Sequence, residues 1–214
     1  MGYNRKSSYV ITAASTCPVT LSELKAFLRV DTSDDDTMLN SMISAATDAA
    51  EQFTGRKFIS TTMGLRLDGF NSVNDDRFLA LGEGVHDGAE NVFFGNLDAI
   101  YLPMQPVVSV TSIKTYDKAN AESTLTSAAY RLDGSGRIYL NDGYSWPVDL
   151  RNFEGVLVTY VAGYGASASA VPASIKQSIT DHAAQMYECR GACGMSDACR
   201  ALLSPFRVID LLWC

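Results

Sequence analysis

The chain has few histidines and none of the common catalytic motifs. Only two of its 214 residues are histidine, His86 and His182, and no G-x-S-x-G, H-E-x-x-H or Walker sequence occurs. The run Gly82-Glu83-Gly84 begins like a dinucleotide-binding fingerprint, but its third glycine is displaced and its acidic surroundings disfavour a pyrophosphate. Because an active site needs several titratable side chains that converge, we predict that the protein is not an enzyme.

Long apolar runs and clusters of basic residues are also lacking. No stretch of about 18 apolar residues occurs that would span a bilayer, so we expect no membrane partner. The start of the chain has no apolar signal core, and Lys6 stands where a myristoylation pattern requires Ser or Thr, which favours an intracellular protein. The 17 Lys and Arg residues are scattered among 24 Asp and Glu residues, for a net charge of −7. This balance disfavours tight binding to nucleic acid.

The cysteines do not follow a disulfide pattern. Their number, five, is odd and their spacing is irregular, which favours a reducing compartment. Cys189, Cys193 and Cys199, with His182 just before them, are residue types that bind zinc, although only one closely spaced pair is present. Free thiols and a core histidine satisfied by a neighbour are the preferred interpretation, with no cofactor. A zinc-binding interaction module built on these four residues remains the alternative.

Hydrophobic periodicity predicts a core of four helices. Thr20 and Glu23 form a capping box that starts a short helix, whose apolar stripe is Leu21, Leu24, Phe27 and Leu28. Apolar residues then recur at helical spacing over residues 34–54 and over residues 172–190, so we expect these two long helices to pack on each other. A short helix over residues 196–203 is ended by Pro205. The acidic run Asp34-Asp35-Asp36 is interpreted as complementing a helix dipole and not as a metal site.

Between these helices the period changes from 3.6 to 2, which predicts strands. Met63, Leu65 and Leu67 alternate with polar residues, and further strands are expected over residues 78–81, 107–116, 130–132, 137–140 and 156–162. Residues 82–98 have the composition of an exposed loop, and residues 163–170 that of a flexible bridge. The predicted fold class is α+β: two N-terminal helices pack on a long C-terminal helix and a short one, with an antiparallel β insertion between them.

We therefore predict three regions along the chain. Residues 1–17 form an N-terminal arm that contains a strand-like run, residues 9–13, and orders on contact with a partner. Residues 18–205 form a single domain with helices over 20–55, a β-rich insertion over 58–165 and helices over 172–204. Residues 206–214 form a tail that is strongly apolar for a chain end. Such a tail either folds back on its own core or docks on another protein.

The order of several short stretches resembles that of tailed-phage head-tail connector proteins, also called adaptor or head-completion proteins. The resemblance covers residues 18–207 and is fairly specific as a whole, although each stretch alone is a helix cap, turn or strand signal. The stretches are residues 18–31, Phe53-Thr54-Gly55-Arg56, Leu67-Asp68-Gly69-Phe70, residues 130–133, Trp146-Pro147, residues 158–165, Val171-Pro172-Ala173 and residues 202–207. Residues 82–98 and 191–199 depart from the family pattern.

This resemblance implies a structural virion protein of the neck. Such connectors assemble as a ring, typically dodecameric, under the portal, complete the DNA-filled head and join it to tail, stopper or nozzle proteins. DNA would pass through the ring without specific binding. By the same resemblance the tail contacts the portal, with Phe206, Ile209, Leu212 and Trp213 as hydrophobic anchors and Arg207 as a polar partner. The implied portal-binding residues are Phe206, Arg207, Val208, Ile209, Leu211, Leu212 and Trp213.

Overall fold

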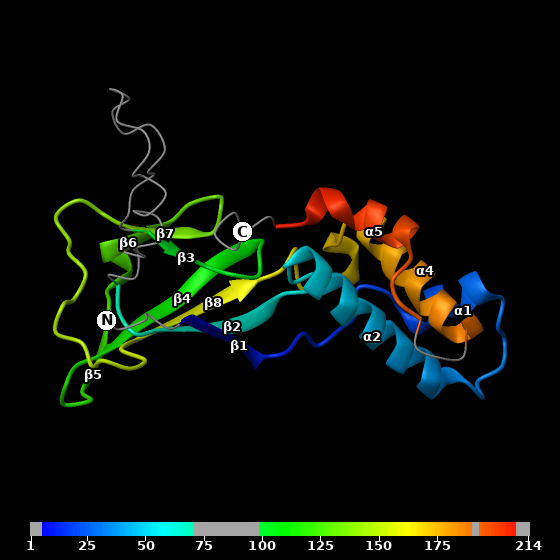
Figure 1. The fold of residues 1–214 in the computed structure, drawn as a ribbon, viewed down its shortest axis with the longest axis horizontal. Coiled ribbons are helices and arrows are strands. Elements are labelled where there is room, and N and C mark those ends of the chain that lie inside the picture. Colours follow the sequence, from blue (N-terminus) through cyan, green and yellow to red (C-terminus); the bar gives the residue numbers. More distant parts are fainter. Residues whose placement is uncertain (1–5, 71–98, 190–192, 209–214) are drawn as a thin grey trace, which may run out of the picture. The chain divides into compact units, whose positions relative to one another are not determined.

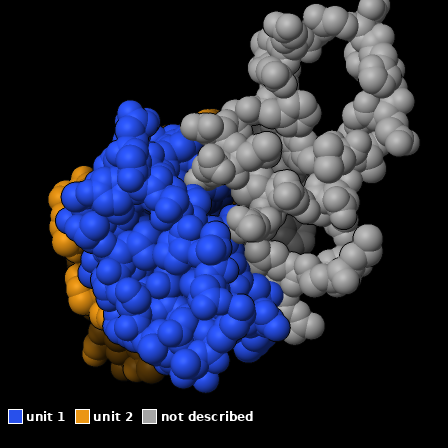
Figure 2. All heavy atoms as spheres, turned by 90° about the vertical axis from the view of Figure 1, so that its left-hand side faces the viewer, with its two compact units in different colours: residues 1–10, 63–102, 109–160 blue, residues 11–62, 103–108, 161–214 orange. Residues whose placement is uncertain are grey.

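The expected α+β class is confirmed. The structure is a computed structural model that describes residues 6–70, 99–189 and 193–208 (Figure 1). The chain forms two compact units, coloured separately in Figure 2. Residues 1–10, 63–102 and 109–160 make up one, here called the strand unit, and residues 11–62, 103–108 and 161–214 make up the other, here called the helical unit.

The helical unit contains four helices among its described residues: α1 (Leu21–Leu28), α2 (Asp36–Thr54), α4 (Ala173–Cys189) and α5 (Asp197–Leu203). The two long helices, α2 and α4, pack against each other as expected, and α1 and α5 also pack on α4. Figure 1 shows α2 and α4 side by side although more than a hundred residues separate them in the sequence. Their shared core is aliphatic and includes Leu39, Ile43, Ala46, Ile175, Ile179, Ala183 and Leu203. None of the described helices is long and apolar enough to cross a membrane.

The start of α1 confirms the predicted capping box. The Thr20 backbone amide donates to Oε2 of Glu23 at 2.7 Å, and the Glu23 amide donates to Oγ1 of Thr20 at 3.2 Å. Nζ of Lys176, on α4, pairs with Oε1 of Glu23 at 2.7 Å. These hydrogen bonds, first that from Lys176 and then that from the Thr20 backbone, lower the pKa of Glu23 to about 2. The same carboxylate thus caps α1 and links it to α4.

The acidic run before α2 contacts its helical neighbours. Asp36 lies in the first turn of α2 and pairs with Nζ of Lys25, on α1, at 2.7 Å. Oδ2 of Asp35 accepts a hydrogen bond from the Tyr187 hydroxyl, on α4, at 2.7 Å. These carboxylates therefore lie at the positive end of the helix dipole and also tie α1 and α4 to the start of α2.

The expected flexible bridge over residues 163–170 is wrong, because its backbone is hydrogen-bonded and closely packed. The Gly163 amide donates to the Pro106 carbonyl at 2.9 Å, and the Ser60 amide donates to the Gly165 carbonyl at 2.9 Å. Gly163 has a φ of +136°, and a Cβ built there would lie 2.6 Å from the carbonyl carbon of Ile59. Glycine is present here because of this close backbone approach and not to provide flexibility. A short 3₁₀ turn, η2 (Ala168–Ala170), completes the connection to α4.

The strands form two sheets, in agreement with the predicted β insertion. The larger has the order β1-β2-β8-β4-β5 and the smaller the order β3-β7-β6. Their bounds are β1 (Lys6–Thr12), β2 (Thr61–Leu67), β3 (Ile100–Tyr101), β4 (Val107–Tyr116), β5 (Glu122–Thr124), β6 (Tyr130–Leu132), β7 (Arg137–Leu140) and β8 (Val156–Ala162). The pairs β3–β7, β4–β5 and β6–β7 are antiparallel. Strands β3 and β5 were not predicted, and the predictions for residues 78–81 and 82–98 lie outside the described residues.

Outside the helices, the N-terminal strand and several side-chain contacts of the strand unit are also defined. The strand-like run in the N-terminal arm overlaps β1, an edge strand of the larger sheet. Within the strand unit, Arg66 binds the Glu154 carboxylate through two hydrogen bonds, at 2.9 and 3.1 Å, and its guanidinium lies 4.8 Å from the centre of the Tyr9 ring. Phe70 and Trp146 stack with ring centres 4.3 Å apart.

Candidate functional site

The tail begins with three residues that are attached to the end of α2. The 3₁₀ turn η3 (Ser204–Phe206) follows α5, and the half-buried Phe206 packs against the helical core. Nε of Arg56 donates a hydrogen bond to the Phe206 carbonyl, and the Val208 amide donates to the Thr54 carbonyl at 2.8 Å. We call residues 206–208 the tail root. For these three residues the structure shows the first of the two alternatives, contact with the chain's own core.

The end of α2 provides an acceptor for this attachment. The last carbonyls of a helix have no partner within the helix. Gly55 ends α2 in the left-handed conformation, with a φ of 66°, and its amide donates to the Glu51 carbonyl. The Thr54 carbonyl is left to accept from Val208. The guanidinium of Arg207 lies 5.5 Å from the centre of the Phe53 ring, which adds a cation–π contact at the same helix end.

Of the seven residues predicted to bind the portal, three are described: Phe206, Arg207 and Val208. Phe206 and Val208 are half-buried, and Arg207 is exposed. The remaining four, Ile209, Leu211, Leu212 and Trp213, lie outside the described residues. Arg56, Thr54 and Phe53, which hold the described three, were not among the predicted site residues.

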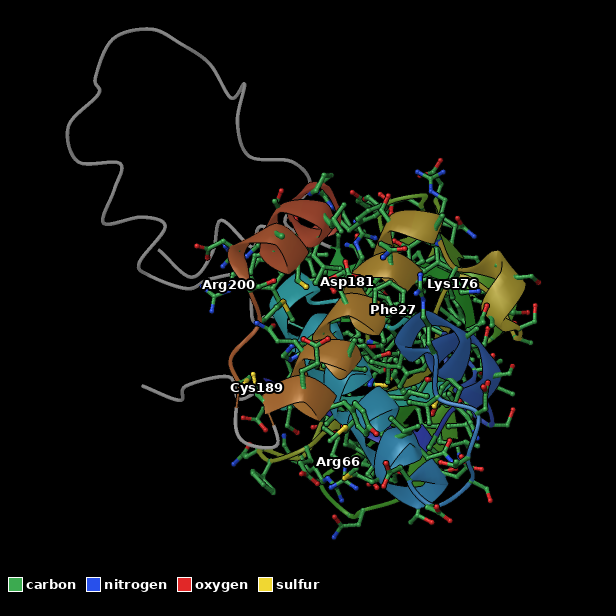
Figure 3. The ribbon with its side chains drawn as sticks, turned by 90° about the vertical axis from the view of Figure 1, so that its right-hand side faces the viewer. Phe27, Arg66, Lys176, Asp181, Cys189 and Arg200 are labelled. Atoms are coloured by element: carbon green, nitrogen blue, oxygen red, sulfur yellow. The ribbon has the colours of Figure 1, made fainter. Side chains whose placement is uncertain are left out.

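Phe27 differs from its predicted place in the apolar stripe of α1. Leu24 is fully buried, whereas Phe27, three positions later, is 52% exposed. Leu24 points into the core formed with α2 and α4, and Phe27 lies at the edge of the stripe. Figure 3 shows Phe27 on the same face of the helical unit as Lys176 and Asp181 of α4. Phe27 is thus an exposed apolar side chain on this face of the helical unit.

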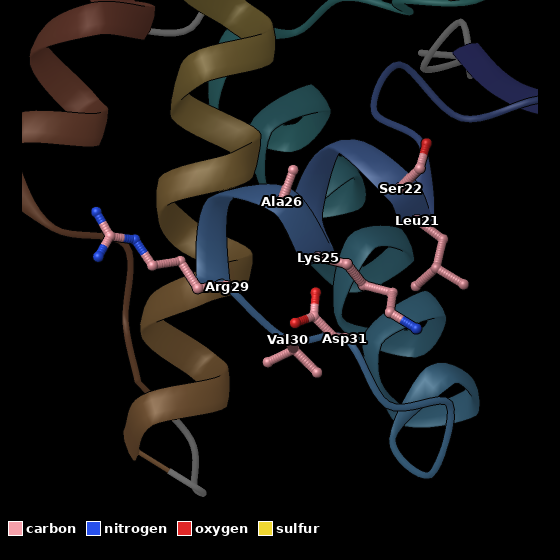
Figure 4. A pocket seen from close by; sticks show the side chains of 7 residues that line it. All are labelled: Leu21, Ser22, Lys25, Ala26, Arg29, Val30 and Asp31. Atoms are coloured by element: carbon pink, nitrogen blue, oxygen red, sulfur yellow. The ribbon is translucent and has the colours of Figure 1, made fainter.

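A hollow of ≈ 630 Å³ runs along the opposite, outer side of α1. Four of its lining residues follow helical spacing, and Figure 4 shows Arg29 and Lys25 extending in opposite directions along it. The lining combines small and aliphatic side chains with two cations and one carboxylate; it comprises Leu21, Ser22, Lys25, Ala26, Arg29, Val30 and Asp31.

The four residues of the zinc alternative are not brought together. His182 is buried on α4, Cys199 is buried on α5, and Cys189 is exposed at the end of α4. A hydrogen bond with Cys189 raises the pKa of the Cys193 thiol, so these two cysteines are neighbours. Across residues 6–70, 99–189 and 193–208 there is no group of three or more His, Cys, Asp or Glu residues able to hold a metal ion.

His182 is a core histidine, as predicted, but its Nδ1 makes no hydrogen bond with any residue that the structure describes. Burial lowers the pKa of His182 and favours the neutral ring. A hydrogen bond with the Gln185 side chain nevertheless raises this pKa against the larger effect of burial, so a neighbour does act on the ring. The other histidine, His86, lies outside the described residues.

Similarity to known proteins identifies the family of this chain. Residues 18–146 match the model of the family described as phage gp6-like head-tail connector protein. The chain belongs to this family. The connector also matches chains of solved particle structures. One chain, from the neck of an empty GTA particle computed with C6 symmetry, is 27% identical with a TM-score of 0.72. Another, from the neck of a native GTA particle computed with C12 symmetry, is 26% identical with a TM-score of 0.72.

A third match, at 26% identity and a TM-score of 0.70, is to the virion of a native gene transfer agent (GTA) particle. All three matches cover 97% of the connector and 98% of the other chain. None of the curated proteins compared with the connector matches it. The connector is thus a structural protein of the neck of a phage-like particle, as the sequence resemblance implied.

Proposed function

We propose that the connector forms a dodecameric ring under the portal, where it completes the DNA-filled head and joins it to tail, stopper or nozzle proteins. The observation that carries this proposal is the similarity over 97% of the chain to a subunit of a neck computed with C12 symmetry. Rings are built from heterologous contacts, in which a patch on one subunit fits a different patch on the next. Exposed Phe27 provides a protruding apolar surface on α1, and the hollow on the outer side of α1 provides a concave one.

We propose further that the tail after Pro205 binds the portal, with Phe206, Ile209, Leu212 and Trp213 as the apolar anchors. Interfaces derive most of their binding energy from a few buried apolar and aromatic residues, and this tail concentrates them in nine positions. The net charge of −7 supports passage of DNA without retention, since an acidic subunit repels phosphate.

The test is co-sedimentation of the connector with portal rings from the same phage. A chain that ends at Pro205 would also lose the contact of Phe206 with the core, so the sharper truncation ends at Val208 and keeps the tail root. We expect the full chain to bind stoichiometrically and the chain ending at Val208 to fold and form rings but to bind the portal far more weakly. Equal binding by the two chains would contradict the assignment of the portal contact to the tail.

A further inference from the structure

The segment after α2, residues 56–58, is held in place independently of the tail. Its Lys57 amide donates to the Gln105 carbonyl at 3.1 Å, and its Phe58 amide donates to Oε1 of the buried Glu51 at 3.0 Å. The Lys57 ammonium also forms an ion pair with Glu51. The backbone from which the Arg56 side chain extends is therefore fixed by three contacts that involve no residue of the tail.

The Arg56 side chain reaches from this fixed segment to the tail root. Its Nε donates to the Phe206 carbonyl, and the guanidinium is half-buried. Burial raises the pKa of the nearby Tyr164 phenol, and the charge of Arg56 opposes this rise, which places the guanidinium beside Tyr164 as well. A guanidinium carries five N–H donors in a rigid fork, so one side chain can hold both partners.

Three consecutive residues of the tail root are each attached differently. Phe206 is held through its carbonyl by Arg56, Arg207 through its guanidinium by the Phe53 ring, and Val208 through its amide by the Thr54 carbonyl. Attachment at three successive residues fixes the direction of the chain as well as its position. The tail thus departs from one defined point at the end of α2.

We infer that Arg56 is a positioning residue for the portal contact, because it fixes the tail root and so defines the starting point of residues 209–214. This inference rests on the proposed function, in which the tail binds the portal. Six residues extend at most about 20 Å, whereas nine would extend about 30 Å if the root were released. The searched volume would then grow roughly threefold, and residues 206–208 would also have to become ordered on binding. Loss of Arg56 removes the first of the three attachments, so we expect the root to loosen and portal binding to weaken by up to about tenfold.

The test compares Arg56→Gln with Arg200→Gln in the full chain. Arg200 is an exposed arginine on α5 whose side chain makes no hydrogen bond to the described residues, so it is a matched control for the loss of charge (Figure 3). In the free protein, hydrogen exchange of the Val208 amide should become about tenfold faster in Arg56→Gln and stay unchanged in Arg200→Gln. Portal affinity should fall, by up to about tenfold, in Arg56→Gln alone. Unchanged Val208 exchange and unchanged portal affinity in Arg56→Gln would overturn the inference.

Two further chains separate the ways in which this can fail. If the chain ending at Val208 binds the portal as well as the full chain does, the proposed function is wrong, and Val208 exchange still decides whether Arg56 fixes the root. If near-UV circular dichroism shows that Arg56→Gln has lost its native packing, Arg56→Lys replaces it, because lysine keeps the charge but lacks the fork. An Arg56→Lys chain that retains both slow Val208 exchange and full portal affinity would then overturn the inference.

Discussion

Replacing Gly163 with alanine is expected to destabilise the connector by about 2 to 6 kcal/mol. The new Cβ would lie 2.6 Å from the Ile59 carbonyl carbon and 2.6 Å from the Ser60 amide nitrogen, distances at which backbone must move. The φ of +136° adds strain, since residues other than glycine held in such regions cost about 1 to 3 kcal/mol. Displacement of packed backbone adds about 1 to 3 kcal/mol more.

For a chain of this size, 1 kcal/mol shifts the melting temperature by about 2 to 4 °C, so the expected decrease is about 4 to 24 °C. The assay is thermal unfolding followed by circular dichroism at 222 nm, at one protein concentration because ring formation would itself shift the melting temperature. Gly134→Ala is the matched control: a Cβ at Gly134 would have no atom within 4 Å, so its effect should stay within about 0.5 kcal/mol. Melting of Gly163→Ala within about 2 °C of the wild type would refute the close-approach explanation.

Three further predictions follow from contacts in the helical unit. Phe27→Ser should leave the melting temperature of the free subunit nearly unchanged, because Phe27 is 52% exposed, and should weaken ring formation in sedimentation velocity; unweakened rings would exclude Phe27 from the subunit contact. The pKa of Glu23 is lowered from 4.5 to about 2, so the ionised carboxylate contributes fully to stability above pH about 4.5. This contribution is lost as the pH falls toward about 2. Glu23→Gln should therefore remove this part of the pH dependence of the free energy of unfolding. Burial lowers the pKa of His182, so on acidification the imidazole binds a proton in the unfolded chain before it does so in the folded chain. The free energy of unfolding should therefore fall as the pH drops below about 6.5. An equally steep fall in a His182→Leu chain would contradict this.

The parts of the fold that the sequence predicted well are those set by neighbours in the chain. The capping box at Thr20 needs only an acceptor and a donor three residues apart. The long helices and the strand of alternating residues that begins at Thr61 follow from periodic burial within one element. Strand β3 has only two residues and β5 consists of three exposed polar residues, so neither shows an apolar period, and they pair with β7 and β4.

The errors arose where a distant segment determines the outcome. Gly163 and its neighbours have the composition of a flexible bridge, yet the backbone of residues 163–165 is hydrogen-bonded to that of residues 58, 60 and 106. Phe27 matches the apolar stripe of α1 by spacing, but the position of α4 decides which side of that stripe is covered. Spacing identifies apolar residues on a helix, and only the packing partner decides which of them become buried.

The candidate site depends both on residues that are neighbours in the chain and on a distant segment. The apolar character of residues 206–214 is local and can be read directly from the sequence, so it predicts a contact but not where that contact begins. Its starting point depends on Arg56 and Thr54, about 150 residues earlier, and no periodicity relates positions so far apart. The type of acceptor is nevertheless general: every helix ends in carbonyls without partners, and a chain that must be anchored at its last residues finds acceptors there.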